Sequence, residues 1–275
     1  MIKGRCCFQS SFFVFLILSL FCVAPSFAGI LKIKTQTTVQ TTGDHLDTSV
    51  VLFNEGTVTA FNLQVHLELL GEIIDSKVNP QLDPSGSSTV VFEKSIEGIK
   101  EGTYPLTVSV DFHDANQYPF SALSGMTFFT GTNVNSDLAI VGEDITMGEN
   151  GNIFMNIKNI GVDEKKILAT IVLPREFSTP TPRIRFVLAP RSRKDLNFEI
   201  RNFSALAGAS YPIFCYFEYD QGNIHHTVVY TAAIKIIKPK KNLFHQYRWL
   251  WIGLAGILIA ALLAPIAKRR KKGKG

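Results

Sequence analysis

Hydrophobic and polar residues alternate along several stretches of the chain. In residues 61–69 every odd-numbered position is apolar and every even-numbered position is polar. The same period of two recurs in residues 106–112. Successive side chains of a β-strand point to opposite faces of the sheet, so this pattern predicts strands with one buried and one solvated face. The turn sequences NEG, DPSGSS, NIG and DQGN separate such stretches, which favours antiparallel sheets packed face to face.

Two longer apolar stretches, near the ends of the chain, lack this alternation. A basic leader precedes the first of them, residues 12–24, and small residues lead from it to Gly29. This layout predicts a cleavable secretory signal peptide at residues 1–28. Phe21 is too bulky for the position before a lipidated Cys22, so ordinary cleavage is favoured over lipoprotein processing.

The second apolar stretch, residues 249–267, has 19 positions without a charge. A helix of that length rises about 28 Å, close to the hydrocarbon thickness of a bilayer. A basic tail, residues 268–275, follows it directly, and the positive-inside rule assigns this tail to the cytoplasm. We therefore expect a single-pass membrane protein whose preceding part is extracytoplasmic, joined to the helix by a basic stalk at residues 239–248. The residues expected to anchor the chain are Trp249, Trp251, Lys268, Arg269 and Arg270.

The part between the two ends contains the same motifs twice. Residues 102–114 are GTYPLTVSVDFHD, and residues 208–220 are GASYPIFCYFEYD. An N-x-G turn begins at Asn54 and again at Asn159, and an L-x-P motif ends at Pro84 and at Pro190. The landmarks keep their order at offsets of 105 to 107 residues. This repetition predicts an all-β exported part made of two tandem β-sandwich domains, residues 29–132 and 133–238.

A Tyr-Pro pair opens one strand of each predicted copy, at Tyr104–Pro105 and Tyr211–Pro212. Proline cannot donate to a strand ladder, so it is expected at the beginning or the edge of a strand. A tyrosine before it can place its ring in the core and its hydroxyl at a loop, as the corner tyrosine of immunoglobulin-like domains does.

Taken together, these motifs are similar to the CARDB-like domains, which are named for bacterial cell-adhesion-related proteins. The resemblance covers both copies and implies immunoglobulin-like sandwiches of the kind common in prokaryotic envelope proteins. It implies no catalytic residues. The second copy departs from the pattern, because Gly208 lies three residues before Tyr211 and because Cys215 takes the place of a usual valine.

The formal net charge of +5 hides a segregation of charge. Residues 29–132 carry 5 basic and 12 acidic residues, whereas residues 133–238 carry 12 and 11. The basic excess belongs to the leader and the membrane flanks, so nucleic acid is not an expected partner. The second copy is rich in arginine, which is one candidate patch for an acidic ligand or partner; ordinary solvated positions are the favoured alternative. The patch residues are Arg175, Arg183, Arg185, Arg191 and Arg193.

Candidate chemistry is sparse. Asp111, His113 and Asp114 could contribute to a metal site, but calcium requires six or more oxygen ligands, and a polar turn is the favoured interpretation. The adjacent histidines 225 and 226 would face opposite sides of a strand, which disfavours a shared zinc ion. Cys215 is the one cysteine after the signal peptide and lies in the apolar phase of its strand, so we expect a buried, inert thiol. Asn202 begins an NFS sequon, relevant in a eukaryotic or archaeal host.

No catalytic triad, phosphate loop or HExxH motif is present in the sequence, so we expect neither an enzyme nor a cofactor. The expected role is that of a membrane-anchored envelope protein that binds or scaffolds other envelope proteins. The alternative is an accessory subunit of a membrane transport or translocation complex, contacted through the transmembrane helix. A carbohydrate-binding module is a third possibility and would require a surface platform of aromatic side chains.

Overall fold

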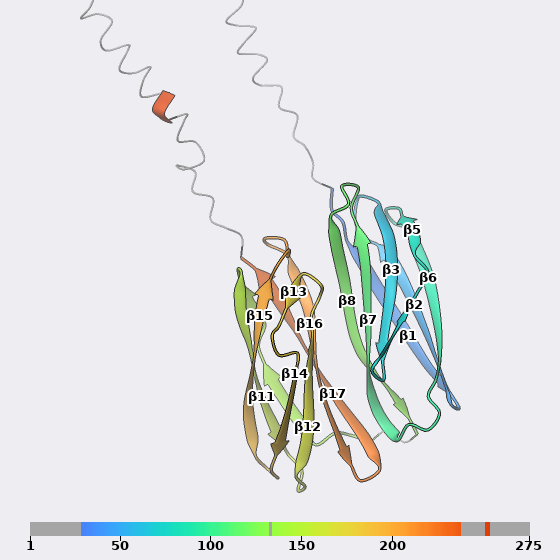
Figure 1. The fold of residues 1–275 in the computed structure, drawn as a ribbon, viewed down its shortest axis with the longest axis vertical. Helices are drawn as coiled ribbons and strands as arrows, with labels where there is room; N and C mark the ends of the chain where they lie inside the picture. The colour runs from blue at the N-terminus through green and yellow to red at the C-terminus, as the bar shows by residue number, and fades with distance from the viewer. Residues whose placement is uncertain (1–28, 132–133, 238–250, 254–275) are drawn as a thin grey trace, which may run out of the picture.

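The computed structural model describes residues 29–131, 134–237 and 251–253, and apart from one helical turn at residues 251–253 its regular elements are all strands (Figure 1). The all-β prediction for the part between the two ends is confirmed. The strands are β1 (Ile33–Thr42), β2 (His45–Asn54), β3 (Ala60–Leu69), β4 (Glu72–Asp75), β5 (Asn79–Leu82), β6 (Ser87–Ser95), β7 (Glu101–His113), β8 (Pro119–Thr130), β9 (Leu138–Gly142), β10 (Ile145–Met147), β11 (Asn150–Asn159), β12 (Lys165–Val172), β13 (Phe177–Ser178), β14 (Arg183–Leu188), β15 (Arg193–Asn202), β16 (Ser210–Gln221) and β17 (Ile224–Ile236).

The strands form two units that lie side by side (Figure 1). In the first unit the sheet β1-β2-β6 faces the strands β3, β4, β5, β7 and β8, and one apolar core drawn from residues 33–128 lies between the layers. In the second unit the sheet β13-β15-β11-β9 faces the strands β10, β12, β14, β16 and β17, and a separate core comes from residues 138–236. Each unit therefore buries its own apolar faces.

The predicted alternation holds in β3 from Leu63 onward, and Phe61 is the exception. Leu63, Leu67 and the other odd-numbered apolar residues that follow are buried, but Phe61 is only half-buried and Ala60 takes its place in the core. The cause is a bulge between Phe61 and Gln64, where Asn62 has a left-handed φ of 54°. An extra residue in a strand shifts the phase of every position before it.

The two N-x-G turns are built by the same hydrogen bonds. The side-chain amide of Asn54 donates to the carbonyls of Val58 and Leu82, at 2.8 and 2.9 Å, and its Oδ1 accepts from the amide of Gly56. Asn159 makes the equivalent bonds to residues 163, 188 and 189, and it accepts from the amide of residue 161. Both asparagines are buried, so each amide ties a turn to a neighbouring strand without leaving a buried polar group unpaired.

Both tyrosines before proline find partners in a loop. The hydroxyl of Tyr104 donates to the carbonyl of Lys100 at 2.8 Å, and the hydroxyl of Tyr211 accepts from the amide of Leu206 at 2.9 Å. The sequence predicted each proline at the beginning or the edge of a strand; Pro105 is the fifth residue of β7 and Pro212 is the third residue of β16. On the side of β3 and β12, pairing begins only after each proline, at Leu106 and at Phe214, so on that side each proline lies at an unpaired edge.

The two units share a sheet. Strand β17 of the second unit pairs in parallel with β7 of the first, with Ile224 opposite Glu101 and His225 opposite Gly102. Gly102 has a φ of 135°, and a methyl group added to it would lie 1.9 Å from the backbone oxygen of His225. This bridge therefore depends on glycine, and it joins the two halves into one ten-stranded sheet.

In the described part of the chain no helix is long and apolar enough to cross a membrane. The predicted signal peptide (residues 1–28) and the predicted stalk (residues 239–248) lie outside the described residues, as do Trp249, Lys268, Arg269 and Arg270. Of the predicted membrane helix, only residues 251–253 are described.

Candidate functional site

The candidate metal residues are not brought together. Asp111 pairs with Arg175, with 2.9 Å between Oδ2 and Nη1. Asp114 accepts hydrogen bonds from the backbone amides of Asn116 and Tyr118, as expected of a polar turn. Across the described residues no group of three or more His, Cys, Asp or Glu side chains could hold a metal ion.

The five candidate arginines do not form one patch. Arg183 and Arg185 share an exposed face of the edge strand β14. Arg175 lies in the loop after β12, Arg191 occupies a turn with a φ of 53°, and Arg193 begins β15 in the opposite sheet. The structure thus groups only the first two.

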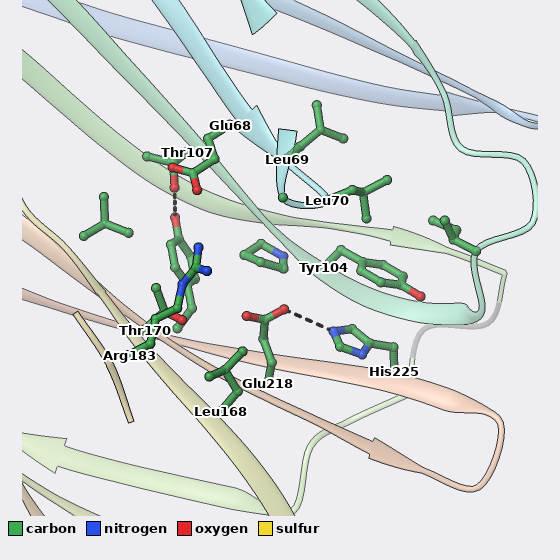
Figure 2. Close-up of a pocket in the computed structure, with 15 residues that line it drawn as sticks. Glu68, Leu69, Leu70, Tyr104, Thr107, Leu168, Thr170, Arg183, Glu218 and His225 are labelled. Atoms are coloured by element: carbon green, nitrogen blue, oxygen red, sulfur yellow. Dashed lines mark hydrogen bonds and ion pairs between the residues drawn. The ribbon is translucent and has the colours of Figure 1, made fainter. Parts of the chain in front are cut away.

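A cleft of about 450 Å³ lies where the two units meet, and we call it the junction cleft (Figure 2). The first unit contributes Glu68, Leu69, Leu70, Gly71, Ile99, Tyr104, Pro105 and Thr107, and the second contributes Leu168, Thr170, Val172, Arg183, Tyr216, Glu218 and His225. Its walls are mostly apolar. The side chains of Glu68 and Arg183 line it, and neither makes a hydrogen bond or an ion pair with a described residue.

Buried aromatic contacts form one wall of the junction cleft. The hydroxyl of Tyr216 lies 3.0 Å from the hydroxyl of Thr107 and donates to the carbonyl of Leu106 at 3.0 Å, so the second unit bonds directly to β7 of the first. Burial raises the pKa of Tyr216 to about 12, and the phenol therefore stays protonated. Gly125 of β8 leaves room for this ring, because a methyl group there would lie 2.4 Å from the Tyr216 hydroxyl.

His225 lies at the other end of the junction cleft, stacked on Tyr104 of the first unit with 4.3 Å between ring centroids. Its Nε2 is 3.4 Å from Glu218 Oε1, as Figure 2 shows. Its Nδ1 is 2.8 Å from Asp220 Oδ1. Burial by itself lowers the pKa of His225, but the carboxylates of Glu218 and Asp220 outweigh this effect and raise it. Lys100 of the first unit binds Asp220 with 2.6 Å between the charged atoms, so a charged network crosses the junction.

Further contacts join the two units near the start of β8 and just after the end of β12. The buried carboxylate of Glu176 accepts hydrogen bonds from the amide and the hydroxyl of Ser121, at 2.9 and 2.6 Å. The hydroxyl of Tyr118 donates to the carbonyl of Ser204 at 3.0 Å. The junction therefore extends over much of the length of both units.

This junction was not predicted, although the amino-acid sequence contains a signal of it. Residues 213–217, IFCYF, are apolar without interruption, and all five are buried. A strand that is apolar on both faces is covered on both faces. The prediction that Cys215 is buried is confirmed, and burial raises the pKa of its thiol to about 12, so the thiolate nucleophile is not formed at neutral pH.

The adjacent histidines lie on opposite faces, as predicted. His226 stacks on Tyr219 with 4.8 Å between ring centroids, on the face opposite to the His225–Tyr104 stack. Burial, followed by the charge of Lys165, lowers the pKa of His226. Each imidazole therefore packs against a tyrosine ring on its own face of β17.

Comparison with protein-family models and with curated proteins gives no match. Among solved structures the chain is similar to Escherichia coli alpha-2-macroglobulin in its native conformation, with 10% identity over 75% of this chain and 17% of that chain, at a TM-score of 0.31. It is also similar to Salmonella alpha-2-macroglobulin reacted with methylamine (10% identity, 76% and 16%, TM-score 0.32) and to red sea bream transglutaminase (11% identity, 87% and 34%, TM-score 0.25). These TM-scores are too low to assign a fold family or a function.

Proposed function

We propose that this chain is a non-enzymatic, membrane-anchored envelope protein whose two immunoglobulin-like domains bind or scaffold other envelope proteins. The signal peptide, the stalk and the transmembrane helix of this proposal rest on the sequence patterns of the two ends. The domains would stand outside the cytoplasm, close to the bilayer, because the basic stalk between them and the helix spans only residues 239–248.

The observation that carries the proposal is the junction between the two units. A shared sheet, buried hydrogen bonds from Tyr216 and Glu176, and the Lys100–Asp220 ion pair all cross it. A junction this extensive resists the bending that separate domains on a flexible linker would allow. Binding surfaces on the two domains are then held at one relative orientation, which is what a scaffold requires.

The immunoglobulin-like assignment is supported by the tyrosine hydroxyl bonds. Tyr104 reaches back to the carbonyl four residues upstream, and Tyr211 bonds to the amide five residues upstream. A corner tyrosine does the same in immunoglobulin-like sandwiches. Together with the two-layer architecture of each unit, this supports the resemblance to CARDB-like domains.

A membrane crosslinking experiment tests the proposal. The full-length chain and a variant in which residues 249–267 are replaced by an unrelated membrane helix would be crosslinked in native membranes and purified. The sandwiches of the two proteins are identical, so a partner bound by the sandwiches is expected with both, at similar yield.

The opposite result would be a set of integral membrane proteins recovered with the native helix and lost with the substitute. That outcome would overturn the binding role of the sandwiches. It would make the chain an accessory subunit held through its transmembrane helix.

A further inference from the structure

Strand β14 forms an open edge of the ten-stranded sheet. It pairs with β12 on one side, from Lys165 opposite Leu188 to Thr170 opposite Arg183, and it stands last in the strand order of the sheet. No other described strand pairs with it. An edge of this kind presents unpaired backbone groups that a second chain can extend.

The register of β14 identifies which backbone groups point outward. The amide of Ile171 donates to the carbonyl of Pro182 at 2.9 Å, so this opposed pair is a hydrogen-bonded one. Bonded pairs alternate along an antiparallel ladder, so Ile184 and Phe186 also bond inward to β12. The amides and carbonyls directed to the open side are those of Arg183, Arg185 and Val187.

The same three residues turn their side chains to solvent, and two of them are cations. Arg183 and Arg185 are exposed, and neither has an ion pair with any described residue. Lys166 of β12 stands opposite Val187, is also exposed, and is likewise unpaired in the described structure. A cavity of about 380 Å³ at this place is lined by Lys166, Ile167, Leu168, Arg185, Phe186 and Val187.

The corresponding edge of the first unit is blunted. There β3 pairs with two strands of four residues, β4 and β5, instead of one continuous strand. Between them the hydroxyl of Ser76 takes the hydrogen bond of the Val65 amide, and Pro80 removes a donor from β5. Short strands and proline hinder strand addition, whereas β14 is six residues long and has no proline within its bounds.

We infer that the β14 edge takes up an extended acidic segment of a partner protein as an added strand. The backbone of the segment would pair with Arg183, Arg185 and Val187, and carboxylates at every second position would lie beside the two arginines. The inference rests on the proposed binding function and names the surface and partner chemistry for it. In the opposite sheet, the two-residue strand β13 covers β15 only at Arg201 and Asn202, but β15 carries both charge signs, with Arg201 paired to Glu199, and so offers no cationic row.

The test uses the full-length chain purified in mild detergent and a labelled octapeptide of four Glu-Thr repeats, capped at both ends. Fluorescence anisotropy measures its binding, and a Lys-Thr octapeptide serves as the charge-reversed probe. Nitrogen-labelled arginine and valine in the protein report amide exchange at the β14 edge. The Glu-Thr peptide is expected to bind and to slow exchange of the Arg183, Arg185 and Val187 amides, and the Lys-Thr peptide is expected to bind at least about tenfold more weakly.

Two pairs of variants, each a test and its control, separate the effect of charge from the effect of backbone pairing. The double variant R183E/R185E is expected to weaken binding of the Glu-Thr peptide at least about tenfold, while R191E/R193E, with the same change in net charge away from β14, changes it by less than about twofold. Val187→Pro removes one outward amide and no charge, and it should weaken binding about fivefold relative to Val187→Thr, which keeps the amide.

Three results would overturn the inference: no binding of the Glu-Thr peptide, equal binding by R183E/R185E, or binding without protection of the β14 amides. Each of these leaves the proposed scaffold function standing if the helix-replaced protein still retains its partner in native membranes. Loss of that partner would instead remove the proposed function itself.

Discussion

Strands β7 and β16 occupy the same place in the two units, yet their outer faces differ. At the positions where β7 has Thr107 and Ser109, β16 has Phe214 and Tyr216. Both aromatic side chains are buried, and they pack with Leu123 of the first unit. Strand β7 thus presents small side chains and β16 presents large rings, so these two outer faces are complementary in size. This difference indicates that the outer face of β16 is suited to being covered by the first unit.

The largest effect is expected from Gly102→Ala, which acts on the bridge between β7 and β17. The new methyl group would meet the backbone of His225, and a φ of 135° is unfavourable for any residue with a Cβ. The free energy of unfolding should fall by more than about 3 kcal/mol. Calorimetry of the full chain should then resolve two transitions, because the units lose their shared sheet.

Gly98→Ala is the matched control for this substitution. Gly98 also has a positive φ, 77°, but no atom lies within 4 Å of an added methyl group. The cost should be about 1 kcal/mol, with one cooperative transition retained. An equal loss at both positions would show that backbone strain alone, and not the bridge, explains the effect at Gly102.

Tyr216→Ala tests the complementary faces themselves. It removes a buried ring and two hydrogen bonds to the first unit, so the free energy of unfolding should fall by about 3 kcal/mol. Tyr216→Phe keeps the ring and should cost about 1–2 kcal/mol. Ser109→Ala, at the matching position of β7, should cost less than about 0.5 kcal/mol. Chemical denaturation measures all three, and similar losses at the two positions would refute the asymmetry.

Apolar alternation and turn residues are local properties, so they were sufficient to predict an all-β chain and two of its strands. Residues 61–69 and 106–112 fall within β3 and β7 as expected. The bulge at Asn62 was not predicted, because the apolar alternation of residues 61–69 carries no sign of it. The alternation therefore wrongly predicted that Phe61 is buried, because the bulge moves its side chain out of the buried face.

The junction cleft was harder to predict because its residues come from two units. Tyr104 and His225 are 121 positions apart in the sequence and meet only through the β7–β17 bridge. The uninterrupted run at residues 213–217 indicated a second covered face of β16, but not which surface covers it. The net charges of the two halves also did not indicate which ion pairs would form across the junction. The ion pairs cross the junction in both directions, from Lys100 to Asp220 and from Arg175 to Asp111.

The two adjacent histidines should respond to pH with opposite signs. The pKa of His225 is raised in the folded chain, so its stabilisation is complete below an unfolded value of about 6.5 and is lost as pH rises through the higher folded value. The pKa of His226 is lowered, so protonation below about pH 6.5 favours the unfolded chain.

His225→Gln and His226→Gln measure this contrast by denaturation between about pH 6 and pH 8. The loss caused by His225→Gln should shrink as pH rises, by less than about 1 kcal/mol because solvent screens the partly exposed Asp220 and Glu218 carboxylates. His226→Gln should cost least at the acid end of the range. Parallel pH profiles for the two variants would contradict the assigned directions.

The smallest effect on stability is expected from Val187→Pro, which gives the second unit an edge proline like Pro80 of the first. The register of β14 directs the amide of Val187 away from β12, so proline removes no ladder bond. The free energy of unfolding should change by less than about 0.5 kcal/mol relative to Val187→Thr, which keeps the amide. A loss of more than about 2 kcal/mol would mean that this amide bonds inward, since a broken ladder bond carries a cost of that size. The outward backbone groups would then be those of Ile184 and Phe186, and the proposed difference between the edges of the two units would be wrong in its register.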